Sequence, residues 1–340
     1  MRILLTSVAF EPSVGGIETV TKVLAEAFTS AGHEVTIATQ TPGGRKSRDS
    51  VAVLRQPSPR ALLTATRRAD VVLQNQISLR LGWPTALLRR PCVVAHHMWT
   101  GRGADSGLKE RVKHAIFPLV RNIACSQAMA KSIAPRATVI PNPYANHQFR
   151  VDHSARRERD LVFLGRLLPA KGLHVALDAL VKLRSHGATP TLTVIGEGIA
   201  EAELRAQVAS SGLSRQVRFV GLLRGTDLVR TLNEHRLLLV PSIWDEPFGV
   251  VALEGLACGL VPIVSDSGGL PDAAGPCGRV VPRADPAALE TAISSLLADD
   301  GARREYLMHA PEHLARHTPE NVASSYLQVL SDAVAGGVAP

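Results

Sequence analysis

Short apolar strands alternate with helices from the first residues of the chain. Residues 2–7 are apolar and β-branched and predict a buried strand, and residues 17–31 predict a helix that ends at Gly32. Residues 33–38 predict the next strand. A strand, a helix and a second strand in this order form a βαβ unit, in which the two strands are parallel. The alternation recurs, with a helix expected over residues 79–90, up to a predicted strand at residues 261–264, so we expect an α/β fold with parallel sheets.

The length of the chain favours two domains. It has 340 residues, which is too long for one small domain, and an apolar content of 45% can fill two cores. We expect an N-terminal domain over residues 1–143 and a polar linker over residues 144–159. A second domain should follow over residues 160–318, with a helical segment over residues 319–340 after it.

Several protein classes are disfavoured by what the sequence lacks. Its cysteines show no C-x-x-C spacing, so a zinc site or a disulfide framework is not expected. The first strand is too short for the core of a signal peptide, and no apolar run approaches the roughly 20 residues that span a bilayer. We therefore expect a cytosolic protein, or one peripheral to a membrane. A nicotinamide-type G-x-G-x-x-G does not follow the first strand, where only the pair Gly15-Gly16 occurs.

Positive charge is concentrated in the first half of the chain. Residues 1–150 contain 20 Lys and Arg against 8 Asp and Glu, whereas residues 151–340 contain 18 against 22. A domain this basic is attracted to an anionic partner such as a membrane surface, a phosphorylated acceptor or nucleic acid. A generally Arg-rich proteome would produce the same excess.

Two glutamates bracket a strand-to-helix junction in the second half. An apolar run at residues 237–240 predicts a buried strand, and Gly249 opens a predicted helix. Glu246 lies on the connecting loop, and Glu254 lies about two helical turns further on. This separation excludes one close acid/base pair and suits the two ends of an elongated ligand. The alternative is an ordinary helix start with two solvated glutamates.

Backbone amides lie between these two carboxylates. Those of Phe248, Gly249 and Val250 are at the predicted helix N-terminus, where unpaired N–H groups bind oxygen atoms and negative charge.

A pair of cations follows an earlier strand of the second half. Gly165-Arg166 ends the strand predicted at residues 161–165, and Lys171 lies just before the next helix. An arginine and a lysine beside a helix N-terminus can clamp a diphosphate. Two solvated cations are the alternative.

Three further positions follow strand ends, where open α/β sheets bind ligands. The strand predicted at residues 92–95 delivers His96 and His97, although a histidine packed at a strand end is the other interpretation. The turn at Gly196-Glu197 and the segment around Leu222 leave room for a nucleotide base.

The E-x7-E spacing from Glu246 to Glu254, with Phe248-Gly249 between, resembles the signature of family 4 of the retaining, nucleotide-sugar-dependent glycosyltransferases. The Gly165-Arg166…Lys171 pattern is the second shared motif. The resemblance covers essentially the whole chain and is strongest in its second half. It implies the GT-B fold, α/β, with two Rossmann-like doubly wound domains facing across a cleft and the final helix crossing back to the first domain.

The resemblance also implies roles for individual residues. Glu246 would contact the hydroxyls of the donor sugar, and Glu254 would hold the ribose. The expected catalytic residues are Arg166, Lys171, Glu246 and His97, and the expected donor-binding residues are Gly15, Gly16, Gly165, Gly196, Glu197, Leu222, Phe248, Gly249, Val250 and Glu254. No metal and no cofactor are expected, because fixed cations and amides would neutralise the diphosphate. Pro143 stands where the family usually has glycine, which leaves the role of Asn142 open.

The function implied is transfer of a sugar, with retention, from a UDP- or GDP-sugar to a hydroxyl acceptor. The expected partners are this donor, a lipid-linked or glycan acceptor and an anionic membrane surface, and not nucleic acid. In the basic segment at residues 109–120, Val112, Ile116 and Phe117 could insert shallowly into a membrane or could face the domain core. A nucleotide-sugar epimerase or phosphorylase of the same fold, and a non-catalytic binding subunit, are the alternatives.

Overall fold

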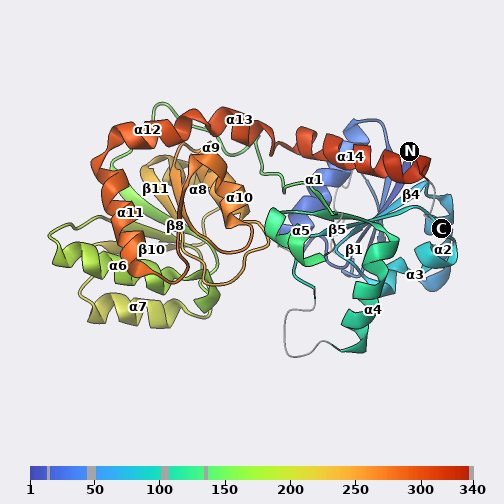
Figure 1. The fold of residues 1–340 in the computed structure, drawn as a ribbon, viewed down its shortest axis with the longest axis horizontal. Coiled ribbons are helices and arrows are strands. Elements are labelled where there is room, and N and C mark those ends of the chain that lie inside the picture. The colour runs from blue at the N-terminus through green and yellow to red at the C-terminus, as the bar shows by residue number, and fades with distance from the viewer. Residues whose placement is uncertain (14–15, 44–50, 101–106, 134–136, 337–340) are drawn as a thin grey trace. The chain divides into compact units, whose positions relative to one another are not determined.

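The computed structural model describes residues 1–13, 16–43, 51–100, 107–133 and 137–336 (Figure 1). The chain divides into two compact units. The first comprises Met1–Pro143 together with Pro319–Pro340, and the second comprises Tyr144–Thr318. Each is a parallel-sheet α/β unit, in agreement with the predicted fold class.

The first unit is built on a seven-stranded parallel sheet. Its order is β3-β2-β1-β4-β5-β6-β7, so the strand order reverses between β1 and β4. Leu4 on β1 lies opposite Thr36 on one side and Val72 on the other. The strands are β1 (Arg2–Ser7), β2 (Glu34–Thr39), β3 (Ala52–Arg55), β4 (Val71–Asn75), β5 (Cys92–His96), β6 (Arg121–Ala124) and β7 (Thr138–Val139).

Serine caps begin three of the helices in this unit. The hydroxyls of Ser58, Ser78 and Ser126 accept hydrogen bonds from backbone amides three residues on, which satisfies a donor that the first helical turn leaves unpaired. The helices are α1 (Gly16–Ser30), α2 (Pro59–Arg68), α3 (Leu79–Leu87), α4 (Leu108–Ile116), the 3-10 turn η1 (Phe117–Leu119), α5 (Gln127–Ile133) and α14 (Pro319–Ala335).

Helix α3 is shorter than the sequence predicts. We expected it to extend to Arg90, but it ends at Leu87. Arg89 adopts a left-handed backbone conformation with φ of 47°, which cannot continue a right-handed helix. The chain therefore leaves the helix before β5 begins.

The last helix of the chain completes the core of the first unit. Helix α14 packs against α1 and across β4 and β5, and Figure 1 shows it in red beside the blue α1. Tyr326 and Leu330 of α14 are buried with Phe28 and Leu24 of α1 in one apolar cluster. A segment far from residue 30 in the sequence thus covers the same face of the sheet.

The second unit has a six-stranded parallel sheet of order β10-β9-β8-β11-β12-β13, which reverses between β8 and β11. Its strands are β8 (Arg159–Leu164), β9 (Leu192–Ile195), β10 (Val217–Gly221), β11 (His235–Val240), β12 (Val261–Ser265) and β13 (Arg279–Val281). Its helices are η2 (Pro169–Lys171), α6 (Leu173–Ser185), α7 (Glu201–Ser210), α8 (Gly225–Asn233), α9 (Val250–Ala257), α10 (Leu270–Ala274), η3 (Gly275–Cys277), α11 (Pro286–Ala298), α12 (Asp300–Met308) and α13 (Ala310–Ala315). Leu161, Leu237 and Ile263 come from three adjacent strands and meet α6 and α11 in its main core.

The hydroxyl of Tyr326 gives a test of this packing. It is buried, it has no hydrogen-bond partner among the described residues, and burial raises the pKa of Tyr326 above its ordinary value. We expect Tyr326→Phe to raise the free energy of unfolding by about 1 kcal/mol, because it removes an unsatisfied polar group. Tyr326→Ala should lower it by roughly 3–5 kcal/mol, because it leaves a cavity.

Calorimetric melting of both variants beside the unsubstituted protein checks this expectation. Equal destabilisation by Phe and by Ala would mean that the hydroxyl makes a stabilising hydrogen bond.

Candidate active site

The carboxyl ends of β8 and β11 bring opposite charges together in the second unit. These strands are neighbours at the point where the strand order reverses, which is where doubly wound sheets bind ligands. Lys171 follows β8 and Glu246 follows β11. The Lys171 ammonium Nζ lies 2.5 Å from Glu246 Oε1. Two of the predicted catalytic residues, 75 positions apart in the sequence, therefore form one ion pair.

The Glu246 carboxylate is held from both its side chain and its backbone. It is 9% exposed, and Ser242 Oγ donates a hydrogen bond of 2.7 Å to its Oε1. Its backbone carbonyl accepts a hydrogen bond of 2.7 Å from the amide of Gly269. Gly268 has φ of 57°, and a Cβ at this position would lie 2.1 Å from the same carbonyl oxygen. Only glycine fits there, so Gly268 allows the neighbouring loop to approach closely.

Two serines fasten the Glu246 loop to the end of β12. Ser265 Oγ donates a hydrogen bond of 2.6 Å to the carbonyl of Ser242, and Ser267 Oγ donates one to the carbonyl of Trp244. Sequence reasoning missed these serines. The sequence signal that could have identified them is their position. Ser265 ends β12 and Ser267 follows it, and β12 lies beside β11 in a parallel sheet.

The Lys171 loop is fixed against the same segment. The carbonyl of Ala170 accepts hydrogen bonds from the amides of Ile243 and Trp244, at 3.0 and 3.3 Å. Gly172 has φ of 69°, and a Cβ there would lie 1.9 Å from the carbonyl oxygen of Pro241. The backbone therefore holds the cation and the carboxylate at contact distance.

Arg166 differs from Lys171 in having no partner. Its side chain is exposed and makes no hydrogen bond or ion pair with the residues that the structure describes. Only its backbone carbonyl is used, as acceptor for the amide of Leu168 at 2.9 Å. The guanidinium, with its planar set of donors, is therefore available to a ligand.

The predicted base-binding positions lie on loops joined to the Arg166 loop. The amide of Gly165 donates to the carbonyl of Ile195 at 3.1 Å, and the amide of Leu167 donates to the carbonyl of Glu197 at 2.9 Å. The amide of Gly196 donates to the carbonyl of Gly221 at 2.8 Å, next to the exposed Leu222. The structure places all of them at the carboxyl ends of β8, β9 and β10.

Phe248 packs against the segment that follows α13 (Ala310–Ala315). It is buried, and its ring centroid lies 5.7 Å from that of His317. His317 Nδ1 donates a hydrogen bond of 2.7 Å to the carbonyl of His313, and burial lowers the pKa of His317 to about 4, so the ring is neutral. The amides of Gly249 and Val250 follow at the start of α9, where no preceding turn supplies acceptors.

Glu254 lies about one turn into α9, four residues after Val250. Its side chain is half-buried, and desolvation raises its pKa to about 7. No opposite charge among the described residues offsets this desolvation. The carboxylate is therefore a strong hydrogen-bond acceptor in a place where water is scarce.

His97 in the first unit is prepared as a hydrogen-bond acceptor. Its Nδ1 donates to Asn142 Oδ1 over 2.9 Å, and its backbone amide donates to Gln76 Oε1 over 3.0 Å. Its Nε2 is buried and has no partner among the described residues. Burial lowers the pKa of His97 to about 4, so Nε2 carries a lone pair at neutral pH. Asn142 therefore fixes the tautomer of His97.

His96 has a different role from its neighbour. It is 1% exposed and packs edge-on against Phe117, with 4.8 Å between the ring centroids. Its Nε2 donates a hydrogen bond of 2.9 Å to Asn122 Oδ1. His96 is therefore a core residue of β5.

Gly16 is the first residue of α1, whereas Gly15 lies outside the described residues. A Cβ at Gly16 would meet no atom within 4 Å, so packing does not require glycine there. Asn75 at the end of β4 donates hydrogen bonds to Thr21 Oγ1 at 2.6 Å and to the carbonyl of Ile17 at 3.3 Å. These bonds fix the start of α1 at the point where the strand order reverses.

Among the residues that the structure describes, no group of three or more His, Cys, Asp and Glu side chains could hold a metal ion.

The raised pKa of Glu254 predicts a pH-dependent stability. Its folded-state pKa of about 7 exceeds the value of about 4.3 for an exposed glutamate, so the folded state binds the proton more tightly. Ionisation of Glu254 therefore lowers the free energy of unfolding progressively as the pH rises from about 4 to about 7. We expect Glu254→Gln to be more stable than the unsubstituted protein by about 1–3 kcal/mol at pH 8, with the difference vanishing near pH 4.

Melting temperatures at both pH values measure this effect, with the exposed Glu203 of α7 as a matched control in Glu203→Gln. A Glu254→Gln protein that is no more stable than the control variant at pH 8 would contradict it.

Comparison with known proteins covers both units. The family model described as Glycosyl transferases group 1 matches residues 146–312, and the one described as Glycosyltransferase Family 4 matches residues 14–145. Glycogen synthase of Mycobacterium tuberculosis is 30% identical over 97% of this chain and 94% of its own length. Phosphatidyl-myo-inositol mannosyltransferase of Mycobacterium leprae is 32% identical over 54% of this chain and 49% of its own length.

Solved structures show the same fold. Anabaena Alr3699/HepE in complex with UDP aligns with a TM-score of 0.81 at 19% identity, over 98% of this chain and 100% of that one. Sucrose-phosphate synthase from Thermosynechococcus elongatus aligns with a TM-score of 0.77 at 22% identity, over 98% and 99% of the two chains. The predicted GT-B class is confirmed. Together with the sequence matches, this shows that the chain belongs to glycosyltransferase family 4 and is a glycosyltransferase.

Proposed function

We propose that this glycosyltransferase is a retaining, metal-independent enzyme that uses a UDP- or GDP-sugar as donor. The observation that carries the proposal is the Lys171–Glu246 ion pair at the reversal point of the second sheet, beside the unpaired guanidinium of Arg166. A diphosphate needs cations and a sugar needs hydroxyl acceptors. This arrangement provides both on adjacent loops.

In the proposed reaction, the bond between the anomeric carbon and the diphosphate breaks, and its electron pair leaves with the nucleoside diphosphate. The developing negative charge is stabilised by Arg166, Lys171 and the amides at the start of α9. These groups do what a metal ion would otherwise do. The acceptor hydroxyl attacks on the face that the diphosphate leaves, through an oxocarbenium-like transition state. Its proton passes to the departing diphosphate, and the configuration is retained.

The remaining site residues fit the binding of the donor. Glu246 and the Nε2 lone pair of His97 would accept hydrogen bonds from sugar hydroxyls, and Glu254 would accept those of the ribose. Phe248, Gly249 and Val250 would contact the sugar–phosphate junction, and Gly16 would allow a phosphate to approach α1 closely. Gly165, Gly196, Glu197 and Leu222 would surround the base. That Anabaena Alr3699/HepE was solved with UDP and glucose supports a UDP-sugar.

Arg166 offers a clean test of the diphosphate clamp. Because it has no protein partner, we expect Arg166→Ala to leave the melting temperature unchanged while turnover falls by about 10²–10³-fold, the effect of losing one donor to a developing oxyanion. Lys171→Ala should lose a similar factor and should also melt earlier, because the poorly exposed Glu246 is left without its cation.

Lys182→Ala, on the exposed end of α6, is the control and should keep normal turnover. Turnover is measured as release of the nucleoside diphosphate, with and without acceptor. Near-normal turnover of Arg166→Ala would remove it from the mechanism. Conversion of the donor without any acceptor would favour an epimerase, and no conversion under any condition would favour a binding subunit.

We propose, further, a lipid-linked or glycan acceptor and contact with an anionic membrane surface at the inner face of the membrane. The expected apolar stripe is divided in the structure: Phe117 is buried, Ile116 packs against the core, and Val112 is 40% exposed. Phe117 is therefore unavailable to a membrane, and of the two alternatives it takes the core-facing one. Leu108 and Leu119 are 76% and 71% exposed, and they offer apolar contacts beside the basic α4.

The lipid in the name of phosphatidyl-myo-inositol mannosyltransferase supports a lipid-linked acceptor. No described helix has the length and apolarity to cross a bilayer. Each Lys or Arg near an anionic surface contributes about 1 kcal/mol.

Co-sedimentation with vesicles tests the membrane contact. We expect binding to anionic vesicles at low salt and weaker binding to neutral ones, and we expect Leu108→Ser with Leu119→Ser to reduce it. Val334→Ser, at an exposed apolar residue on α14, is the matched control. Equal absence of binding to both vesicle types would exclude the membrane contact and favour a soluble acceptor.

A further inference from the structure

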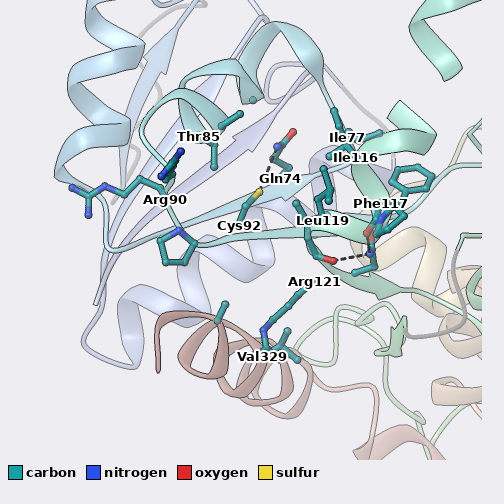
Figure 2. Close-up of a pocket in the computed structure, with 18 of the residues that line it drawn as sticks. Gln74, Ile77, Thr85, Arg90, Cys92, Ile116, Phe117, Leu119, Arg121 and Val329 are labelled. Carbon is teal, nitrogen blue, oxygen red and sulfur yellow. Dashed lines mark hydrogen bonds between the residues drawn. The ribbon is translucent and has the colours of Figure 1, made fainter. Parts of the chain in front are cut away.

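A large apolar cavity lies within the first unit (Figure 2). Its volume is about 930 Å³, near the upper end of the range of small-molecule sites. It is enclosed by α3, the 3-10 turn η1, the first residues of β5 and β6, and the end of α14. Its walls are mainly apolar and include Trp83, Ala86, Ile116, Leu119 and Val329.

The cavity is separate from the proposed donor site. Cys92, Arg121 and Thr138 line it, and each is the first residue of its strand. His97 follows the last residue of β5, at the opposite end of the same strand from Cys92. Five residues of extended strand separate the two places by about 15 Å. A ligand at the strand starts therefore lies away from His97, although the cavity also reaches Gln74 and Ile77, whose neighbour Gln76 accepts a hydrogen bond from the His97 amide.

The local backbone explains why this space is unfilled. Helix α3 ends at Leu87, and Arg89 turns the chain away in a left-handed conformation. Phe117 and Ile116 enter the core further along β5 and β6. Between α3, η1 and α14, the side chains leave the space over the amino ends of these two strands unfilled.

Cations surround this cavity. Arg89, Arg90 and Arg121 line it. Arg121 Nη2 donates to the carbonyl of Asp332 at 3.1 Å and Arg90 donates to the carbonyl of Arg67, whereas Arg89 has no partner among the described residues. Asp332 is the one acidic residue in the described lining. The rim is thus net positive and holds guanidinium donors that no carboxylate satisfies.

One polar atom in the wall is also unsatisfied. Thr85 is 5% exposed and lines the cavity, and its Oγ1 has no hydrogen-bond partner among the described residues. The Gln74 amide, by contrast, has two partners. Its Nε2 donates to Cys92 Sγ over 3.6 Å, and its Oε1 accepts from the backbone amide of Ser78 over 3.1 Å. Figure 2 shows Thr85, Gln74 and Cys92 around this space. A buried hydroxyl without a partner is uncommon, and one in the wall of a cavity is available to a ligand.

We propose that this cavity binds a free single-chain amphiphile with an anionic head, of the fatty-acid type. Apolar walls require an apolar body, because a polar body would lose its hydrogen bonds to water without replacement. The arginine rim selects an anionic head, since guanidinium groups bind carboxylates with paired, charge-assisted hydrogen bonds. The site neither depends on the proposed sugar transfer nor supplies its acceptor.

Calorimetric titration with monomeric dodecanoate tests the site. Ala86→Trp, at an exposed position of α3 that lines the cavity, should abolish binding, and the smaller Ala86→Leu should weaken it. Arg89→Gln should weaken binding about fivefold or more, because this guanidinium has no other partner. Arg80→Gln, on the same helix but outside the cavity lining, is the control and should bind as the unsubstituted protein does. Dodecanol should bind more weakly than dodecanoate.

Retained melting temperature and retained sugar transfer in the Ala86 variants show that the fold is intact. If dodecanoate binds here, it should protect the Cys92 thiol from alkylation. Mass spectrometry measures this protection and locates the ligand independently. Undiminished dodecanoate binding to Ala86→Trp, or no binding to the unsubstituted protein, would overturn the proposal. Equal affinity for dodecanol would overturn the anionic head. If Ala86→Trp no longer bound anionic vesicles but still bound dodecanoate, the cavity lining would be a contact for membrane lipid instead of a site for a free amphiphile.

Discussion

The ion pair between Lys171 and Glu246 is the interaction on which the second unit's site depends. Both groups are poorly exposed, and a buried charge is tolerated only when it is paired and hydrogen-bonded. The pairing in turn requires two loops from neighbouring strands to lie within contact distance. Gly172, Gly268 and the serine hydroxyls of Ser265 and Ser267 make that approach possible. A pair of charges at the strand ends therefore requires glycines and serines in two other segments, the one after η2 and the one at the end of β12.

Sequence reasoning predicted the strands and singled out the charged residues that follow them, because strand ends and charged motifs are local signals. Arg166, Lys171 and Glu246 all lie where a buried strand ends, and open α/β sheets bind ligands there. The serines that fasten the Glu246 loop, and the hydrogen bond from His97 to Asn142, join residues distant in sequence. Such contacts follow from the order of strands in the sheet, which the chain order alone does not determine. The early end of α3 was missed because Arg89 has a backbone conformation that its residue type rarely adopts.

Each unit holds one candidate group in a state that favours ligand binding and does not stabilise the fold. His97 buries an acceptor nitrogen without a partner, and Glu254 keeps a carboxylate where desolvation raises its pKa to about 7. Neither arrangement stabilises the empty protein. Both supply acceptors for hydroxyl groups, and sites that bind polar ligands commonly leave such groups unsatisfied until the ligand arrives. Each is kept in place by its surroundings, His97 by Asn142 and Glu254 by the buried helix that carries it.

Helix α14 has a consequence for the order in which the molecule forms during translation. The second unit ends at Thr318, so its sequence has been synthesised before any residue of α14 has been added. The first unit, whose strands and remaining helices are made first, must wait for Tyr326 and Leu330 to cover one face of its sheet. A nascent chain extends by roughly 5–20 residues per second, so this exposed apolar face persists while about half of the chain is made. The unit that begins first on the ribosome is thus the last to be completed.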